Sequence, residues 1–276
     1  ILGSIYLAGY IGKPINLLVK GVKAIGEGNY NQRIDIIPSD EIGDLTASFN
    51  RMAKSLQEKE FIKKTFSSYV TKQVADLIIN NPEKAGIQGE RRNISILFAD
   101  IRNFTWIAEK IDAQKVVNLL NKYYSIMVDV VIAHNGTIDK FLGDALMALF
   151  GAPLYFTNHA EEAVAAGLEI KQAMKDLNYH LKNLDLEEVK IGIGINTGDV
   201  VVGNIGSEGK KMEYTAIGDS VNIAHRLQTV ARNNNVIISE STYQRVKDLF
   251  VIQPKTPVIV KGKEQPITIY EVIAKK

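Results

Sequence analysis

Ile94-Ser95-Ile96-Leu97-Phe98-Ala99-Asp100 is an apolar run that is typical of a buried strand, and it ends in a carboxylate. A second stretch, Asp139-Lys140-Phe141-Leu142-Gly143-Asp144, lies between two apolar runs and predicts a tight hairpin with Gly143 at the turn. Two aspartates beside buried strands are costly to bury unless a cation is present. The pattern therefore indicates a site for hard divalent cations such as Mg²⁺ or Mn²⁺, which prefer oxygen ligands. The alternative is that Asp144 is a surface turn residue and Asp100 caps a helix near Thr105.

The composition limits the class of protein. With 276 residues, 46% of them apolar, the chain can form one large domain or a domain with an appendage. A net charge of +2 gives no sign of nucleic-acid binding, and the absence of cysteine excludes disulfides and thiolate metal sites. The histidines at 134, 159, 180 and 225 form no pair at helical spacing, so we expect surface or partly buried imidazoles.

The chain begins at Ile1 rather than Met, so we expect it to be a piece of a longer protein. Residues 1–12 are apolar and uncharged, and Lys13-Pro14 follows them. A bilayer span needs about 20 residues. We therefore expect residues 1–12 to be the end of a transmembrane helix with Lys13 at the membrane surface. A buried soluble helix is the alternative.

Two short helices with heptad seams follow. Gly26-Glu27-Gly28-Asn29 ends the first helix, and Ser39-Asp40-Glu41 supplies an N-cap and early negative charge for the second. The apolar seams are Ile15, Leu18, Val22 and Ile25 in the first helix, and Ile42, Leu45, Phe49, Met52 and Leu56 in the second. Such helices cannot bury their seams alone, so we expect a dimeric, all-α, parallel four-helix bundle.

These residues resemble a HAMP linker, the family that joins membrane helices to cytoplasmic output domains of signalling receptors. The resemblance rests on Pro14, Gly26-Glu27-Gly28, Asp40-Glu41-Ile42-Gly43-Asp44-Leu45 and Phe49-Asn50-Arg51-Met52. It implies a HAMP domain over residues 13–60, with both HAMP and output domains cytoplasmic at the cell membrane. A plain coiled-coil stalk is the alternative.

Residues 61–92 are predicted to be a signalling helix and a linker. The stripe Phe66, Val70, Val74 and Leu77 does not follow in phase from Leu56, which predicts a stutter or break near 57–65. Asn80-Asn81-Pro82 ends the helix, and a polar linker with Arg91-Arg92 leads to a second domain over 93–276.

The second domain alternates strands with helices, and adjacent hairpins argue for an α+β, ferredoxin-like fold. We expect helices near 105, 113–134, 158–183, 219–231 and 240–248, and strands at 94–101, 137–142, 145–150, 189–196, 199–205, 212–217, 235–239, 257–261 and 267–273. Thr197-Gly198 is predicted to be the turn between two of these strands.

Three segments of this domain, in order, resemble the class III nucleotide cyclases. They are Phe98-Ala99-Asp100-Ile101-Arg102-Asn103-Phe104-Thr105, Asp139–Asp144, and Glu213-Tyr214-Thr215-Ala216-Ile217-Gly218-Asp219-Ser220-Val221-Asn222-Ile223-Ala224-His225-Arg226. The resemblance covers residues 66–274. It implies cyclisation of a nucleoside triphosphate, in which the 3′-hydroxyl attacks the α-phosphorus and pyrophosphate leaves, with two Mg²⁺ or Mn²⁺ ions per site.

The resemblance also implies residue roles. Asp100 and Asp144 match the metal-binding aspartates, with a backbone carbonyl near Ile101. Lys140 and Thr215 match the pair that contacts the purine. Asn222 matches the residue that orients the ribose, and Arg226 the residue that contacts phosphate in the transition state. Lys210 or Lys211, and Lys261, fall near positions that hold the triphosphate, although exposed loop charge is the alternative for these lysines.

Lys140 and Asp144 lie four residues apart across a tight turn, so we do not expect them to contact the same nucleotide. The family resolves this by dimerisation: one subunit supplies the aspartates, and the other supplies Lys140, Thr215, Asn222 and Arg226. A homodimer of this chain would then have two complete sites.

A lysine donor and a threonine acceptor match the acceptor N1 and donor N6 of adenine, so we expect an adenylate cyclase of the Lys–Thr subclass that uses ATP. Asn103, where the motif usually has glycine, and His225, where a small residue is usual, depart from the pattern and predict modest activity. A guanylate cyclase and a catalytically silent dimeric relay are the alternatives. The Gly-Gly-Asp/Glu-Glu-Phe signature of the diguanylate cyclases is absent.

Overall fold

The computed structural model describes residues 11–35, 40–69, 89–182, 188–207, 211–232, 234–259 and 266–276. Within these ranges, the side chains of 62–69, 180–182 and 211 are not described. The chain forms two compact units, Ile1–Val70 and Thr71–Lys276. The expected transmembrane end at residues 1–12 lies almost wholly outside the described residues, and so does most of the linker.

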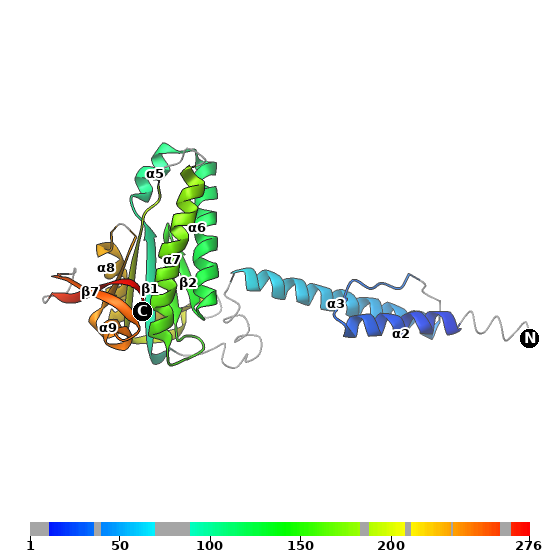
Figure 1. The fold of residues 1–276 in the computed structure, drawn as a ribbon. Helices are drawn as coiled ribbons and strands as arrows, with labels where there is room; N and C mark the ends of the chain where they lie inside the picture. Colours follow the sequence, from blue (N-terminus) through cyan, green and yellow to red (C-terminus); the bar gives the residue numbers. More distant parts are fainter. Residues whose placement is uncertain are drawn as a thin grey trace, which may run out of the picture. The chain divides into compact units, whose positions relative to one another are not determined.

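The N-terminal unit consists of α2 (Lys13–Gly26) and α3 (Glu41–Tyr69) (Figure 1). Asp40 caps α3, because its Oδ1 accepts hydrogen bonds from the backbone N–H groups of Ile42 and Gly43 at 3.0 and 3.1 Å. Gly21 lets the helices approach, since a Cβ there would lie 2.6 Å from the Phe49 ring. The small core consists of Leu18, Ile34, Phe49 and Ala53.

Other seam residues remain at the surface of this unit. Ile15, Val22 and Leu45 are 42%, 54% and 54% exposed. With Met52, which is 45% exposed, four of the nine predicted seam residues are therefore exposed within the single chain. α3 is continuous to Tyr69, so of the predicted stutter or break near 57–65 the structure excludes the break. Residues 57–65 contain neither Gly nor Pro, and their helix propensity keeps the backbone helical where the apolar stripe changes phase.

The C-terminal unit is built on one mixed, eight-stranded sheet with the order β2-β3-β1-β4-β6-β8-β7, and β5 pairs with β4. This confirms the α+β class. The strands are β1 (Glu90–Ile101), β2 (Thr137–Leu142), β3 (Ala145–Phe150), β4 (Ile191–Ser207), β5 (Lys211–Ile217), β6 (Asn235–Ser239), β7 (Phe250–Val258) and β8 (Ile267–Lys275). The helices are α5 (Phe104–Lys110), α6 (Ala113–Ala133), α7 (His159–Lys182), α8 (Asp219–Val230) and α9 (Glu240–Val246).

Strand β1 is buried on both faces, because helices cover both sides of the sheet (Figure 1). Leu97, Ala99 and Ile101 face the core formed with α6 and α7. Ile96 and Phe98 face the other side, where α8 packs. Alternate side chains of one strand therefore fill two cores, which anchors its carboxyl end, at Asp100, to both helical layers.

Three strand boundaries differ from the prediction. β4 runs unbroken through Thr197-Gly198, so the predicted turn there is wrong. Gly198 instead allows close packing, since a Cβ there would lie 2.4 Å from Ser220 Oγ of α8. β7 begins at Phe250 rather than 257, and its prolines, Pro254 and Pro257, are compatible with its place at the sheet edge. β1 begins at Glu90, within the expected linker.

Helix α6 is the one helix in the described ranges that is long and apolar enough to cross a membrane. Its buried residues, among them Leu119, Tyr123 and Met127, belong to the main core of the C-terminal unit. We therefore assign α6 as a core helix.

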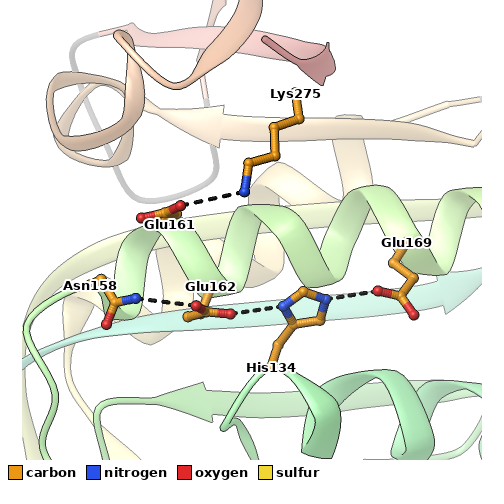
Figure 2. Close-up of polar contacts among 6 residues, drawn as sticks. All are labelled: His134, Asn158, Glu161, Glu162, Glu169 and Lys275. Atoms are coloured by element: carbon orange, nitrogen blue, oxygen red, sulfur yellow. Dashed lines mark hydrogen bonds and ion pairs between the residues drawn. The ribbon is translucent and has the colours of Figure 1, made fainter.

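His134, directly after α6, joins this helix to α7 (Figure 2). Its Nδ1 lies 2.8 Å from Glu162 Oε2, and its Nε2 lies 2.8 Å from Glu169 Oε2. Asn158 Nδ2 also donates to Glu162, over 3.1 Å. The imidazole therefore bridges two turns of α7 and stabilises the pairing of the two helices.

We expect His134→Leu to lower the free energy of unfolding by about 1–2 kcal/mol, because it removes the contacts of a largely buried side chain with Glu162 and Glu169. Urea unfolding can be followed through Trp106, the single tryptophan, which lies in α5. Lys275→Ala is the matched control, since Lys275 is 63% exposed and its nitrogen lies 3.6 Å from Glu161. The control should change stability by less than about 0.5 kcal/mol. An equally small change for His134→Leu would contradict the assignment.

Candidate functional site

Asp100 and Asp144 lie side by side at the carboxyl end of β1. The antiparallel register of β1 and β3 places Ala99 opposite Leu146, which brings the β2–β3 turn next to Asp100. Burial, a hydrogen bond that the protonated Asp144 carboxyl donates to Asp100, and the negative charge of Asp100 raise the pKa of Asp144 to about 7. The backbone N–H of Ile101 also donates to the Asp144 carboxylate, which opposes that rise. The two carboxyl groups are therefore close enough to share one proton or to bind one cation.

The turn that carries Asp144 is held by its own residues and by α6. Gly143 has φ +65°, a left-handed conformation that favours glycine. The Tyr124 hydroxyl of α6 donates a hydrogen bond to the Gly143 carbonyl, and its ring lies 4.3 Å from that of Phe141 between centroids. The predicted hairpin with Gly143 at its turn is confirmed.

Two neighbours of Asp100, Gln228 and Arg102, were not singled out from the sequence. Gln228 Nε2 donates to Asp100 Oδ2 over 2.8 Å, and Arg102 Nη1 lies 3.9 Å from the same oxygen. Arg102 also donates to the backbone carbonyl of Gln228. Gly192 leaves room for the guanidinium, because a Cβ there would overlap it. The available signal was a polar residue, Gln228, on the buried face of α8 beside Ala224 and Leu227.

Asn103 takes over the role of the glycine that the motif usually carries. Its φ of 57° and ψ of 32° are left-handed, and it directly precedes α5. Asparagine is the non-glycine residue that adopts this conformation most readily. The loop after Asp100 therefore keeps a left-handed residue despite the substitution.

Lys140 of β2 and Thr215 of β5 are joined through Asp139, although their strands contact each other without pairing. Lys140 Nζ donates to Glu213 Oε2 over 2.9 Å and lies 3.6 Å from Asp139 Oδ1. Thr215 Oγ1 donates to Asp139 Oδ2 over 2.7 Å. Burial raises the pKa of Asp139, while the hydrogen bond from Thr215 and the charge of Lys140 oppose this rise. This cluster joins β2 to β5 and contains a side chain, Asp139, with no exposed surface.

Helix α8 carries Asn222 and Arg226 one turn apart. Asn222 is exposed and Arg226 is half-buried. Nη1 of Arg226 is buried without a hydrogen-bond partner among the described residues. His225 packs edge-on against Phe98, with 5.2 Å between ring centroids, so the larger residue at this position fills space beside the sheet. A buried guanidinium nitrogen without a partner is costly, and the described residues supply none for this nitrogen of Arg226.

The structure thus forms two separate groups from the residues singled out. Asp144 contacts Asp100, whereas Lys140 contacts Asp139 and Glu213, although the two residues are close in sequence. Lys210 and Lys261 lie outside the described residues, as does the side chain of Lys211. The described ranges contain no cluster of three or more His, Cys, Asp or Glu side chains arranged to hold a metal.

Comparison with known proteins identifies the family of each unit. The family model for the adenylate and guanylate cyclase catalytic domain matches residues 88–273, and the HAMP domain model matches residues 6–58. Adenylate cyclase 1 of Rhizobium meliloti (strain 1021) is 30% identical over 276 residues. That alignment covers 99% of this chain but only 40% of the relative, so the chain spans less than half of its length.

Solved structures of two cyclases resemble the C-terminal unit. The adenylyl cyclase CyaB from P. aeruginosa is 35% identical, with a TM-score of 0.67, over 69% of this chain and 98% of that one. The guanylyl cyclase Cya2 is 39% identical, with a TM-score of 0.66, over 69% and 96%. Neighbours of both nucleotide classes therefore occur. From the matched domain models, the shared sheet and the paired aspartates, this chain belongs to the class III nucleotide cyclases, with a HAMP domain preceding the cyclase catalytic domain.

Proposed function

We propose that the protein is an adenylate cyclase that converts ATP to 3′,5′-cyclic AMP and pyrophosphate. The observation that carries the choice of ATP is the Lys140–Thr215 pair, which Asp139 and Glu213 hold together at the β2–β5 contact. Lys140 donates to adenine N1, and Thr215 accepts from the N6 amino group. Guanine presents the opposite pattern on this edge, a donor at N1 and an acceptor at O6.

Asp100, Asp144 and the backbone carbonyl of Ile101 would hold two Mg²⁺ or Mn²⁺ ions. The residues fit this role, because carboxylates that already compete for a proton favour a cation in its place, and hard cations prefer oxygen ligands. Oxygens of the triphosphate would complete the coordination. When bound, the ions would lower the pKa of the ribose 3′-hydroxyl and neutralise the leaving pyrophosphate.

The remaining roles belong to the chain's own side chains. Asn222 orients the ribose, so that the 3′-hydroxyl lies in line with the α-phosphorus. Arg226 spreads its guanidinium over the phosphoryl oxygens, where negative charge increases in the transition state. Lys210 and Lys261 bind the triphosphate tail. Arg102 and Gln228 hold the Asp100 carboxylate in place.

The active unit in this proposal is a homodimer with sites shared between the copies. Three observations support it. Lys140 and Asp144 contact different residues. Nη1 of Arg226 has no hydrogen-bond partner among the described residues, and part of the apolar seam of α2 and α3 is exposed. A second copy would supply the missing half-site and cover the seam. In the N-terminal unit this gives a parallel four-helix bundle.

Regulation in this proposal passes through the HAMP domain. Residues 1–12 would belong to the end of a transmembrane helix, and both domains would lie on the cytoplasmic side of the cell membrane. Small rotations of the HAMP helices would alter how the two catalytic half-sites meet, because both copies contribute to each site. A signal from outside the membrane would then change the rate of cyclisation.

A guanylate cyclase is the second candidate, favoured by the likeness to the guanylyl cyclase Cya2. Direct competition between ATP and GTP decides between the two activities. A silent dimeric relay would instead show nucleotide binding by calorimetry without turnover.

We expect Asp100→Ala and Arg226→Ala each to lower cyclic AMP formation by about 10³-fold or more, since each removes charge stabilisation from the transition state. The assay uses ATP with Mg²⁺ or Mn²⁺ and quantifies the cyclic product. Wild-type rates in either variant would refute the assignment.

Mixing these two inactive variants should restore activity to about one quarter of the wild-type value, because random pairing gives heterodimers with one intact site. Mixing Asp100→Ala with Asp144→Ala is the matched control and should restore nothing, since both changes damage the same half-site. Equal results from the two mixtures would rule out shared sites.

The Asp144 pKa predicts a pH-dependent stability. The pKa rises from 3.8 to about 7 on folding, so the folded state binds the proton more tightly. This stabilisation is complete below about pH 4 and is lost as the pH rises through about 7. As the pH rises from 5 to 8 without divalent cations, the free energy of unfolding of the wild type should fall by about 1–2 kcal/mol relative to that of Asp144→Asn. This figure allows for the partial exposure of Asp144.

Thermal melts at constant ionic strength measure this difference. Mn²⁺ at pH 8 should raise the Tm of the wild type more than that of Asp144→Asn, since binding stabilises the folded state. Parallel pH profiles for the two proteins would contradict the proposed pairing of the carboxylates.

A further inference from the structure

Asp139 is a buried carboxylate to which neither the sequence motifs nor the proposed reaction assigns a role. Its side chain has no exposed surface, which is costly for an acidic group. Oδ2 accepts a hydrogen bond from the Thr215 hydroxyl at 2.7 Å. The other oxygen, Oδ1, is buried, accepts no hydrogen bond from the described residues, and lies 3.6 Å from Lys140 Nζ. The carboxylate of Asp139 can therefore act directly on the two side chains that it contacts, Thr215 and Lys140.

The hydrogen bond to Thr215 decides what that hydroxyl can do. A threonine hydroxyl has one proton to donate and two lone pairs that accept. With Asp139 accepting the proton, Thr215 Oγ1 offers only lone pairs to a ligand. Without Asp139 the hydroxyl could rotate and donate as well. It would then accept a hydrogen bond from adenine N6 or donate one to guanine O6 equally readily.

We propose that Asp139 is a positioning residue that fixes Thr215 as an acceptor and so determines the preference for adenine over guanine. This inference rests on the proposed function, because it presupposes that Thr215 contacts the base. An aspartate at position 215 would be an acceptor whatever its neighbours, and Thr215 together with Asp139 reproduces that property with two residues.

The same carboxylate aligns the second base contact. Its Oδ1 forms an ion pair with Lys140 Nζ at 3.6 Å, while Glu213 accepts a hydrogen bond from that nitrogen at 2.9 Å. Glu213 is about half-exposed and contacts Lys140, whereas Asp139 is buried and contacts both members of the pair. The two acidic residues can therefore be separated by mutation.

The test compares kcat/KM for ATP with kcat/KM for GTP in the full chain. In Asp139→Asn the side-chain amide can donate a hydrogen bond to Thr215 Oγ1, which leaves the Thr215 O–H free to donate to the base. The ratio of kcat/KM for ATP to kcat/KM for GTP should therefore fall by about tenfold or more. Asp139→Ser, whose hydroxyl both donates and accepts, makes the same prediction if the asparagine variant does not fold. Where turnover is too low, the ratio of Kd values for ATP and GTP from calorimetry replaces it.

Three further variants separate positioning from a structural effect. Glu213→Gln is the matched control and should shift KM for ATP while leaving the ratio within about threefold. In a Thr215→Ala background, Asp139→Asn should no longer change the ratio, because the hydroxyl on which it acts is gone. Thr215→Asp combined with Asp139→Asn should restore the preference for ATP.

A wild type that prefers GTP would refute the proposed function itself. A wild type that prefers ATP, with a ratio unchanged by Asp139→Asn, would refute only the inference about Asp139. A ratio that falls equally with and without the Thr215 hydroxyl would also refute it, since Asp139 would then act by another route.

Discussion

Two carboxylates held against each other, those of Asp100 and Asp144, are the constraint on which the C-terminal unit depends. Bringing them together costs free energy, because like charges repel and part of their hydration is lost. The fold stabilises the arrangement from several sides: β1 is anchored in two cores, Gly143 and Tyr124 hold the turn, and Gln228 and Arg102 hold Asp100. The raised pKa of Asp144 shows that some of this cost remains, and a bound cation would remove it.

The second constraint is that several groups lack a full set of partners among the described residues. Nη1 of Arg226 is buried without a hydrogen bond there, Oδ1 of Asp139 has only the ion pair with Lys140, and apolar seam residues of α2 and α3 are exposed. A substrate between two copies would contact the first group, and a second copy would cover the seam. Such groups occur in both units. This is consistent with a protein whose catalysis depends on its dimerisation.

Much of this organisation could be predicted from the sequence. The hairpin around Gly143, the long helices α6 and α7, and the α+β class follow from apolar periodicity and turn chemistry, which are local signals. The errors arose where packing overrides such signals. Thr197-Gly198 resembles a turn, yet Gly198 lies inside β4 because α8 packs too closely for a side chain. Gln228 and Arg102 contact Asp100 only through tertiary structure, which spacing along the chain does not reveal.

The central claim is that the aspartates of one copy and the base-contacting pair of another serve the same nucleotide. A structure of the full chain with a non-cyclisable ATP analogue and Mn²⁺ tests it most directly. The account predicts the nucleotide between two copies, with metal-bound phosphates at Asp100 and Asp144 of one copy. Lys140 and Thr215 of the other copy would contact adenine. A nucleotide bound wholly within one copy, or a base remote from Lys140 and Thr215, would contradict the account.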